Sequence, residues 1–285
     1  MGATLLWASN FLVVKHALRH GFSPLAYTGP RYFIAGVVFA LIARRRREFE
    51  IERRDVGRFA AAGITGMCLS QVTFVYALQN ATASTVALLF STAPLLVALF
   101  LRWSRTAQVG RAHWISATLS VSGVALVIAG STGRVGGNTV GAGFAVLTAV
   151  LWAIYCVAAA PLTQRYGSLQ VNAIVILTGA TPLLAAAAIP LARENWDAVS
   201  LSAWVAFAYS TLVAGVAANA IWFAAMRRVG VARAALYTNL EPFFVVLMAV
   251  LILSEHVTTL QLLGGIILVT SLLRIGRRVP PPPVE

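Results

Sequence analysis

Residues 76–99 read YALQNATASTVALLFSTAPLLVAL, and residues 224–247 read AAMRRVGVARAALYTNLEPFFVVL. The two stretches align without a gap at an offset of 148 residues. Their identities are Ala77 with Ala225, Ala87-Leu88 with Ala235-Leu236, Pro94 with Pro242, and Val97 with Val245. Leu6-Trp7-Ala8 and Leu151-Trp152-Ala153 correspond at a slightly different offset. We therefore predict an internal duplication, with a first repeat over residues 1–135 and a second over residues 136–285.

Apolar stretches of about 20 residues, the length that crosses a bilayer, recur along the whole chain. The sequence is 59% hydrophobic and 11% charged, whereas a soluble domain carries about 25% charged residues. We predict an all-α membrane protein with ten transmembrane helices. The predicted spans are 3–20, 25–43, 57–79, 82–101, 112–130, 139–162, 169–191, 203–226, 232–252 and 258–275.

What remains outside these spans is short connections and tails, which leave no room for an extramembrane catalytic domain. The metalloprotease, nucleotide-binding and paired-cysteine motifs are all lacking. We therefore expect neither an enzyme nor an ATP-driven pump, and no cofactor, metal site or catalytic residue. The first span has no basic leader and no small-residue cleavage site before it, so we expect a retained helix rather than a signal peptide.

The net charge of +13 suggests a nucleic-acid partner at first sight. The basic residues lie between apolar spans rather than in one domain, so we predict no nucleic-acid partner. If both termini are cytoplasmic, 17 of the 22 basic residues fall on the cytoplasmic side. Because cytoplasmic loops are enriched in Lys and Arg, we predict this orientation in a bacterial inner (plasma) membrane, with a short Pro-rich cytoplasmic tail.

Each repeat contains five predicted spans, which is an odd number, so the second repeat would enter the membrane inverted relative to the first. Inverted repeats are typical of secondary transporters, in which the substrate binds near the midplane at the repeat interface. Rocking of one bundle against the other would then give alternating access around a central cavity. The alternative is a duplicated membrane scaffold that transports nothing.

Polar and aromatic side chains inside the spans fall at corresponding positions of the two repeats. Gln71 corresponds to Asn219, for example, and each amide has an aromatic ring three residues later on the same helix face. Polar groups in hydrocarbon tend to face the bundle interior or a cavity. An amide beside a ring suits a zwitterion with an apolar or aromatic side chain. The predicted substrate-binding residues are Trp7, Asn10, Gln71, Phe74, Trp152, Tyr155, Asn219, Trp222, Tyr237 and Asn239.

Each of these residues also has a simpler interpretation. Asn and Gln join transmembrane helices through hydrogen bonds, and single aromatic residues pack between helices. Both interpretations are left open at this point.

Glu241 lies inside the ninth predicted span and is followed by Pro242. A lone carboxylate there is either protonated because of desolvation or paired with a cation. It would be a proton-linked site or a site for a substrate ammonium group, or else a structural ion pair with Lys15 or Arg31. Lys15, Glu241, Pro94 and Pro242 are the predicted coupling or gating residues, and the two prolines would break their helices and let the halves rock.

Several of these segments resemble EamA-type members of the drug/metabolite transporter superfamily. They are Trp7-Ala8-Ser9-Asn10-Phe11 with Lys15, Arg31 before an apolar span, Ala83-Ser84-Thr85-Val86-Ala87-Leu88-Leu89 before Pro94, and Ala232-Arg233-Ala234-Ala235-Leu236 before Asn239-Leu240-Glu241-Pro242. The chain departs from the family at Leu101-Arg102-Trp103-Ser104 and at Ser254-Glu255, where members often show Gly-Glu. The first departure argues against a role for a symmetric acidic pair at those ends.

The resemblance implies ten helices in two inverted repeats, a central cavity and export of small metabolites. Within the family the chain is most similar to bacterial exporters of aromatic amino acids and related metabolites. The expected partners are a small-molecule substrate, namely an amino acid or metabolite, and the lipid bilayer. The alternatives are export of organic cations or drugs, transport of nucleotide sugars, and a passive facilitator channel. Both a monomer and a homodimer remain open.

Overall fold

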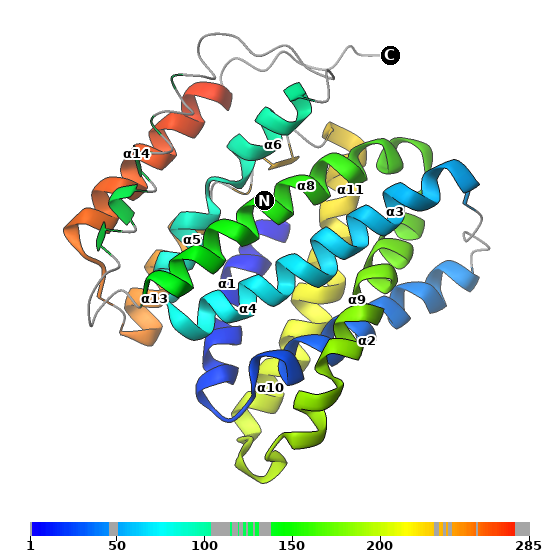
Figure 1. Cartoon of the computed structure of the whole chain (residues 1–285), viewed down its shortest axis with the longest axis horizontal. Helices are drawn as coiled ribbons and strands as arrows, with labels where there is room; N and C mark the ends of the chain where they lie inside the picture. The colour runs from blue at the N-terminus through cyan, green and yellow to red at the C-terminus, as the bar shows by residue number, and fades with distance from the viewer. Residues whose placement is uncertain are drawn as a thin grey trace.

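The computed structural model describes a bundle of helices with no β-strand among its described residues (Figure 1). The helices are α1 (Gly2–Arg19), α2 (Pro24–Arg45), α3 (Val56–Ala62), α4 (Ser70–Asn80), α5 (Ala83–Phe90), α6 (Ala93–Trp103), α8 (Thr139–Arg165), α9 (Ser168–Arg193), α10 (Leu201–Tyr209), α11 (Asn219–Val229), α13 (Glu241–Leu253) and α14 (Thr259–Gly276). The described residues are 2–45, 51–103, 115, 119, 122–123, 125–127, 129–130, 138–230, 234–235, 238, 241–254 and 256–276.

Within the described part of the chain, six helical segments are long and apolar enough to cross a membrane. They are Pro24–Arg45, Arg53–Asn80, Ala83–Trp103, Thr139–Arg165, Ser168–Arg193 and Leu201–Val229. Each overlaps one predicted span, and α1 and α14 also lie where helices were predicted. The predicted span 112–130 and the start of the predicted span 232–252 fall largely outside the described residues.

The turn between α1 and α2 requires a glycine. Gly21 has φ of +115°, and a Cβ atom there would lie 2.4 Å from the carbonyl oxygen of Ala198. The backbone N–H of Ser200 donates to the His20 carbonyl beside it, at 3.1 Å. This close approach, possible only without a side chain, joins the first helical hairpin to the segment before α10.

Side-chain caps begin three of the other helices. Thr82, Asn138 and Ser200 accept hydrogen bonds from backbone N–H groups in the first turns of α5, α8 and α10, respectively. These caps satisfy N–H groups that have no partner inside the helix. Thr82, Asn138 and Ser200 therefore help to fix where these helices begin.

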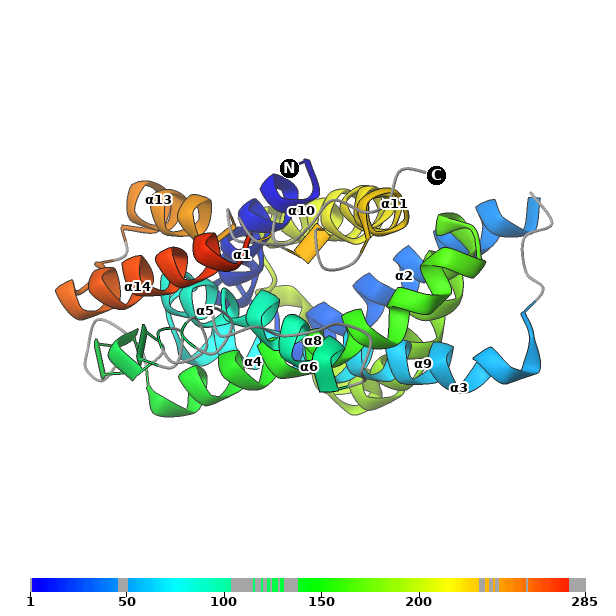
Figure 2. The ribbon, with the colours of Figure 1, turned by 90° about the horizontal axis from the view of Figure 1, so that it is seen from above.

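Helices from the two predicted repeats pack on one another rather than forming separate bundles. Helix α2 lies along α9, and α4 lies along α8 (Figure 1). A Cβ atom on Gly63 or Gly179 would lie within 3 Å of the facing segment, so these glycines allow close approach of the helices. Helix α1 contacts α13 on one side and α10 on the other (Figure 2).

A buried ion pair joins the start of α3 to the end of α8. The Asp55 carboxylate has no exposed area and accepts hydrogen bonds from Arg165, at 2.9 and 3.0 Å, and from the Tyr166 hydroxyl, at 3.0 Å. Arg58, one turn away, donates to the same carboxylate at 3.1 Å. Every lone pair direction of this carboxylate is used, as a buried charge requires.

Three irregular segments interrupt the long helices near the centre of the molecule. Residues Gly63–Leu69 (η2) and Ser210–Ala218 (η4) form π-helical turns that continue into α4 and α11. The third lies at Ser91 and Thr92, between α5 and α6, where both hydroxyls donate to carbonyls of the preceding turn. Such irregular backbone needs substitute hydrogen bonds inside a membrane, and π-turns are frequent at functional sites.

Candidate functional site

A small cavity lies next to these irregular segments. Its walls come from α1, α2, η2, α4, α5, α8, α11 and α13, so elements of both predicted repeats contribute. Half of the lining residues are aromatic, and three amides and one carboxylate lie among the rings. The lining residues are Trp7, Asn10, Phe11, Tyr32, Met67, Gln71, Phe74, Phe90, Thr148, Trp152, Asn219 and Glu241.

The two lining amides on α4 and α11 satisfy carbonyl groups released by the π-helical turns. Gln71 Nε2 donates to the Gly66 carbonyl at 3.4 Å, and Asn219 Nδ2 donates to the Ala214 carbonyl at 3.2 Å. The offset of 148 residues maps Gln71 on Asn219 and Gly66 on Ala214. Each amide therefore donates a hydrogen bond to a carbonyl of its own helical segment, while its oxygen remains able to accept one from a ligand.

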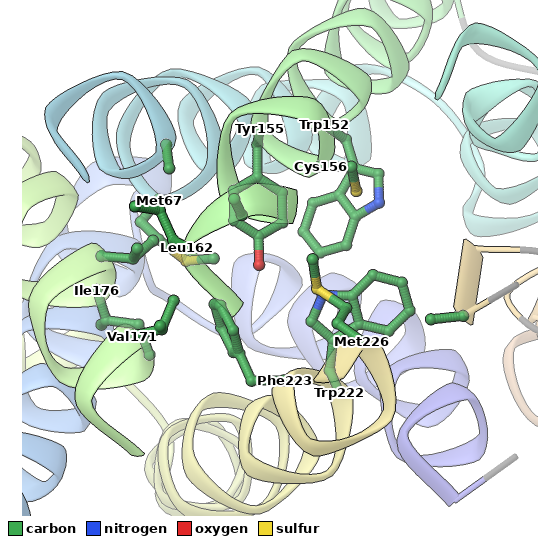
Figure 3. Close-up of a cluster of buried hydrophobic side chains, with 14 of the residues drawn as sticks. Met67, Trp152, Tyr155, Cys156, Leu162, Val171, Ile176, Trp222, Phe223 and Met226 are labelled. Atoms are coloured by element: carbon green, nitrogen blue, oxygen red, sulfur yellow. The ribbon is translucent and has the colours of Figure 1, made fainter. Parts of the chain in front are cut away.

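Tryptophan rings gather at one end of the cavity. The ring centroids of Trp7, Trp152 and Trp222 lie between 5.4 and 5.9 Å from one another. Figure 3 shows Trp152 and Tyr155 on α8 pointing toward Trp222 and Phe223 on α11. Aromatic pairs at these separations are favourable beyond their burial, so the rings form a fixed apolar wall.

A line of hydrogen bonds runs from the cavity wall into the protein. The Ser210 hydroxyl donates to Asn10 Oδ1 at 2.6 Å, and the Tyr27 hydroxyl donates to Ser210 Oγ at 2.5 Å. All three side chains are buried. The bond from Ser210 holds the side-chain oxygen of Asn10 in place, and this also fixes the orientation of the side-chain amide nitrogen.

Glu241 is the first residue of α13, and Pro242 follows it. Proline is favoured at the start of a helix because its missing N–H costs nothing there. The Glu241 side chain is 3% exposed, and its Oε2 finds no hydrogen-bond partner among the described residues. No ion pair joins it to Lys15 or Arg31 within the described part of the chain. Of the interpretations left open above, the structural ion pair with these two residues is therefore not observed.

Lys15 contacts the end of a neighbouring helix in the first half of the chain. Its ammonium group donates to the carbonyl oxygens of Leu78 and Ala81 at the end of α4. A cation at a helix C-terminus satisfies carbonyls that have no partner inside the helix and interacts favourably with the helix dipole. Its observed contacts thus fix the end of α4, and a part in coupling or gating remains a prediction.

The structure brings together Trp7, Asn10, Gln71, Phe74, Trp152, Asn219 and Glu241 around one cavity. Tyr155 and Trp222 lie behind the wall and contact Trp152, with ring centroids 4.8 and 5.9 Å away. Pro94 is the second residue of α6, just after the interruption at Ser91 and Thr92. The predicted site residues Tyr237 and Asn239 lie outside the described residues.

Sequence reasoning missed five lining residues: Phe11, Tyr32, Met67, Phe90 and Thr148. Helical spacing could have found two of them. Met67 precedes Gln71 by four residues, and Thr148 precedes Trp152 by four, so each lies on the same helix face as a predicted residue. The others are ordinary apolar or aromatic residues whose exposure to the cavity depends on tertiary packing.

The fold and this cavity define a class: a multi-pass membrane protein whose helices enclose a small polar and aromatic cavity. The chain belongs to the EamA-like transporter family, whose model matches residues 1–129 and 139–277. This confirms the resemblance to the drug/metabolite transporter superfamily. The protein is accordingly a membrane transporter of that family.

Curated relatives of similar length cover nearly the whole chain. A probable terminal-alkyne amino-acid exporter from Streptantibioticus cattleyicolor is 27% identical over 278 residues, covering 95% of this chain and 90% of that protein. The uncharacterized inner membrane transporter YedA from Escherichia coli K12 is 24% identical over 281 residues, covering 97% and 90%. A solved crystal structure with 20% sequence identity has a TM-score of 0.67 and covers 97% of this chain and 96% of that one, which supports the fold.

Proposed function

We propose that the protein is a secondary transporter that exports amino acids, aromatic or other neutral ones, and related small metabolites by alternating access. The observation that carries this proposal is the composition of the cavity. Tryptophan rings, amides and a single carboxylate without a partner among the described residues line one enclosed space between the predicted repeats. A relative named as a probable amino-acid exporter supports the same substrate class.

Each group has a distinct role in this proposal. The rings of Trp7 and Trp152 would contact the apolar side chain of the substrate. The amides of Gln71 and Asn219 would accept hydrogen bonds from, or donate them to, its polar end. Glu241 would receive the ammonium group, because a buried carboxylate without a partner is costly and an incoming cation offsets that cost. Asn239 and Tyr237 remain proposed members of the same site.

The helix interruptions would supply the conformational change. The π-turn η2 contributes Met67 to the cavity wall, η4 precedes the lining residue Asn219, and the interruption before Pro94 follows the lining residue Phe90. Pro242, next to the lining residue Glu241, remains a proposed hinge position. Bends at such positions absorb changes in backbone angle while the intact helices move as rigid bodies. We therefore propose that two inverted five-helix repeats rock about these segments, with both termini in the cytoplasm.

Export of organic cations is the second candidate function, since Glu241 and the tryptophan rings could hold a cation without any carboxylate group. Nucleotide sugars are disfavoured because their phosphates require several basic groups, and of the two candidates, Lys15 and Arg31, the Lys15 ammonium already binds carbonyls at the end of α4. A passive channel would conduct without saturation and without exchange. A single transport experiment distinguishes amino-acid export, cation export and a channel.

The test is counterflow in proteoliposomes. Vesicles are loaded with one unlabelled amino acid from a panel, and labelled phenylalanine, methionine or threonine is supplied outside. The proposal predicts saturable accumulation that depends on the amino acid inside, with none in protein-free vesicles. Folded protein that accumulates no amino acid, but exchanges a labelled aromatic ammonium ion, would replace the amino-acid proposal with the cation one. Flux without saturation or exchange would indicate a channel.

A further inference from the structure

Arg31 carries a buried positive charge to which the proposed function assigns no role. Its side chain is 1% exposed, and it is among the largest fully buried side chains of the described residues. Its Nε and Nη1 atoms find no hydrogen-bond partner there, and no acidic group of the described residues forms an ion pair with it. Arginine stays charged in proteins, so the guanidinium is a buried charge without an anionic partner among the described residues.

Two independent contacts place Arg31 directly behind the cavity wall. The guanidinium carbon lies 4.6 Å from the ring centroid of Tyr32, which lines the cavity. It also lies 5.3 Å from the ring of Tyr27, which is joined through Ser210 to Asn10, another lining residue. The charge is therefore in direct contact with a ring of the cavity wall.

The two tyrosine rings compensate the charge only in part. Cation–π contacts attract a guanidinium, but they leave its N–H donors without acceptors, and buried donors without acceptors are costly. The guanidinium has a planar fork of N–H groups that matches the two oxygens of a carboxylate. An anionic group entering the cavity would both neutralise the charge and satisfy the free donors.

We propose that Arg31 binds the carboxylate of the transported amino acid, with a rotation of the Tyr32 side chain bringing the guanidinium into contact with the cavity. This inference rests on the proposed function, and it assigns opposite ends of the zwitterion to two residues. Glu241 takes the ammonium group and Arg31 takes the carboxylate. The site then selects amino acids over amines that have the same side chain but no carboxylate.

The test measures displacement of labelled phenylalanine from the purified full-length protein by three unlabelled compounds. Phenylalanine keeps both charges, phenylalaninamide replaces the carboxylate by a neutral amide, and phenethylamine lacks it. The wild type should bind phenylalanine at least about tenfold more tightly than either of the others, the ratio expected for a hydrogen bond to a charged group. Equal displacement by phenylalaninamide would overturn the proposal without any variant.

Variants of Arg31 then assign the selectivity to this residue. In Arg31→Gln the affinity for phenylalanine should fall to that for phenylalaninamide, while the affinity for the amide stays about the same. Arg31→Lys should keep part of the selectivity, because it keeps the charge but not the planar fork. Arg193→Gln removes an exposed arginine at the end of α9 and is the matched control, with unchanged selectivity expected.

The possible results separate this inference from the proposed function. If no labelled amino acid binds to folded wild-type protein, the proposed function fails and the role of Arg31 fails with it. If phenylalanine binds but Arg31→Gln still prefers it to the amide, only the role of Arg31 is wrong. If Arg31→Gln does not fold, the ligand series on the wild type and Arg31→Lys decides between the two results.

Discussion

In each of the two π-helical turns one backbone carbonyl accepts two side-chain hydrogen bonds, but the donors differ. In η2 the Gly66 carbonyl accepts hydrogen bonds from Gln71 and from the Ser70 hydroxyl, both on the same helical segment. In η4 the corresponding Ala214 carbonyl accepts from Asn219 and from the indole N–H of Trp7 on α1, at 3.2 and 3.3 Å. The position equivalent to Ser70 is Ala218, which has no donor.

This difference indicates that the first turn is self-contained, whereas the second depends on a helix from the other half. A missing hydroxyl at residue 218 leaves a carbonyl that Trp7 satisfies instead. The same indole ring forms part of the cavity wall. A ligand that moves Trp7 would thus alter the hydrogen bonding of η4 directly, while η2 would meet the ligand through Met67 and Gln71 of its own helical segment.

The two halves also meet the cavity with unequal charge. The offset of 148 residues maps Glu241, the first residue of α13, on Ala93, the first residue of α6. Both helices begin with a residue followed by proline, so the backbone design is shared. Only the second half places a carboxylate there, so the charge of the cavity lining is not shared between the halves.

Removal of this charge should have the largest effect. Glu241→Gln keeps the size of the side chain but takes away the anion proposed to bind the ammonium group. Losing one partner of a buried charge pair typically costs about 3–5 kcal/mol, so phenylalanine affinity should fall by about a hundredfold or more. Binding to purified protein measures this, and a Glu241→Gln variant with wild-type affinity and transport would exclude the coupling role.

Gly66→Ala tests the packing difference between the turns. A Cβ atom at Gly66 would lie 2.5 Å from carbons of the Tyr155 ring, whereas η4 has alanine at the corresponding position. Overpacking of this kind costs about 1–3 kcal/mol, so the midpoint of thermal unfolding in detergent should fall. Gly143→Ala on α8 is the control, because nothing lies within 4 Å of a Cβ atom there. Equal midpoints for the two variants would contradict the packing argument.

Trp7→Phe tests the dependence of η4 on the other half. The substitution keeps an aromatic ring but removes the donor to the Ala214 carbonyl. Hydrogen bonds between membrane helices contribute about 0.6 kcal/mol on average and about 1.7 kcal/mol at most, so the loss of stability should be modest. Ser70→Ala is the matched change in η2. If the carbonyls behave alike, both variants lose similar stability, but only Trp7→Phe also weakens substrate binding.

Ala218→Ser should have the smallest effect and is the sharpest test of the comparison. The new hydroxyl can donate to the Ala214 carbonyl four residues earlier, as the Ser70 hydroxyl does to Gly66. In a Trp7→Phe background it should recover about half a kcal/mol, measured by thermal unfolding, while adding little to the wild type. Equal effects in both backgrounds would show that the indole and the hydroxyl do not satisfy the same carbonyl.

Much of this arrangement could be predicted from the sequence. Apolar stretches of membrane-crossing length predicted where the helices lie. Gly21, Pro24 and Gly230 fall between predicted spans, where each restricts or permits particular backbone angles. The internal offset paired Gln71 with Asn219 before any contact was known. The pair indicated a cavity because polar side chains inside a membrane usually face the bundle interior or a water-filled space.

The contacts between particular helices could not be predicted in the same way. Nothing in the sequence indicates that Lys15 reaches the end of α4, or that Trp7 reaches the Ala214 carbonyl, because both depend on which helices are neighbours. The π-turns were missed as well, since residues 63–69 and 210–218 have ordinary helical composition. Tyr32 and Phe90 line the cavity only because neighbouring helices turn them inward.

The most direct test of the central claim is equilibrium binding of labelled phenylalanine to the purified protein, with wild type and Glu241→Gln measured side by side. The account predicts saturable binding to the wild type that unlabelled neutral amino acids displace, and a large loss of affinity in the variant. Absence of saturable binding to folded wild-type protein, or equal binding to both proteins, would contradict the claim that this cavity holds amino acids.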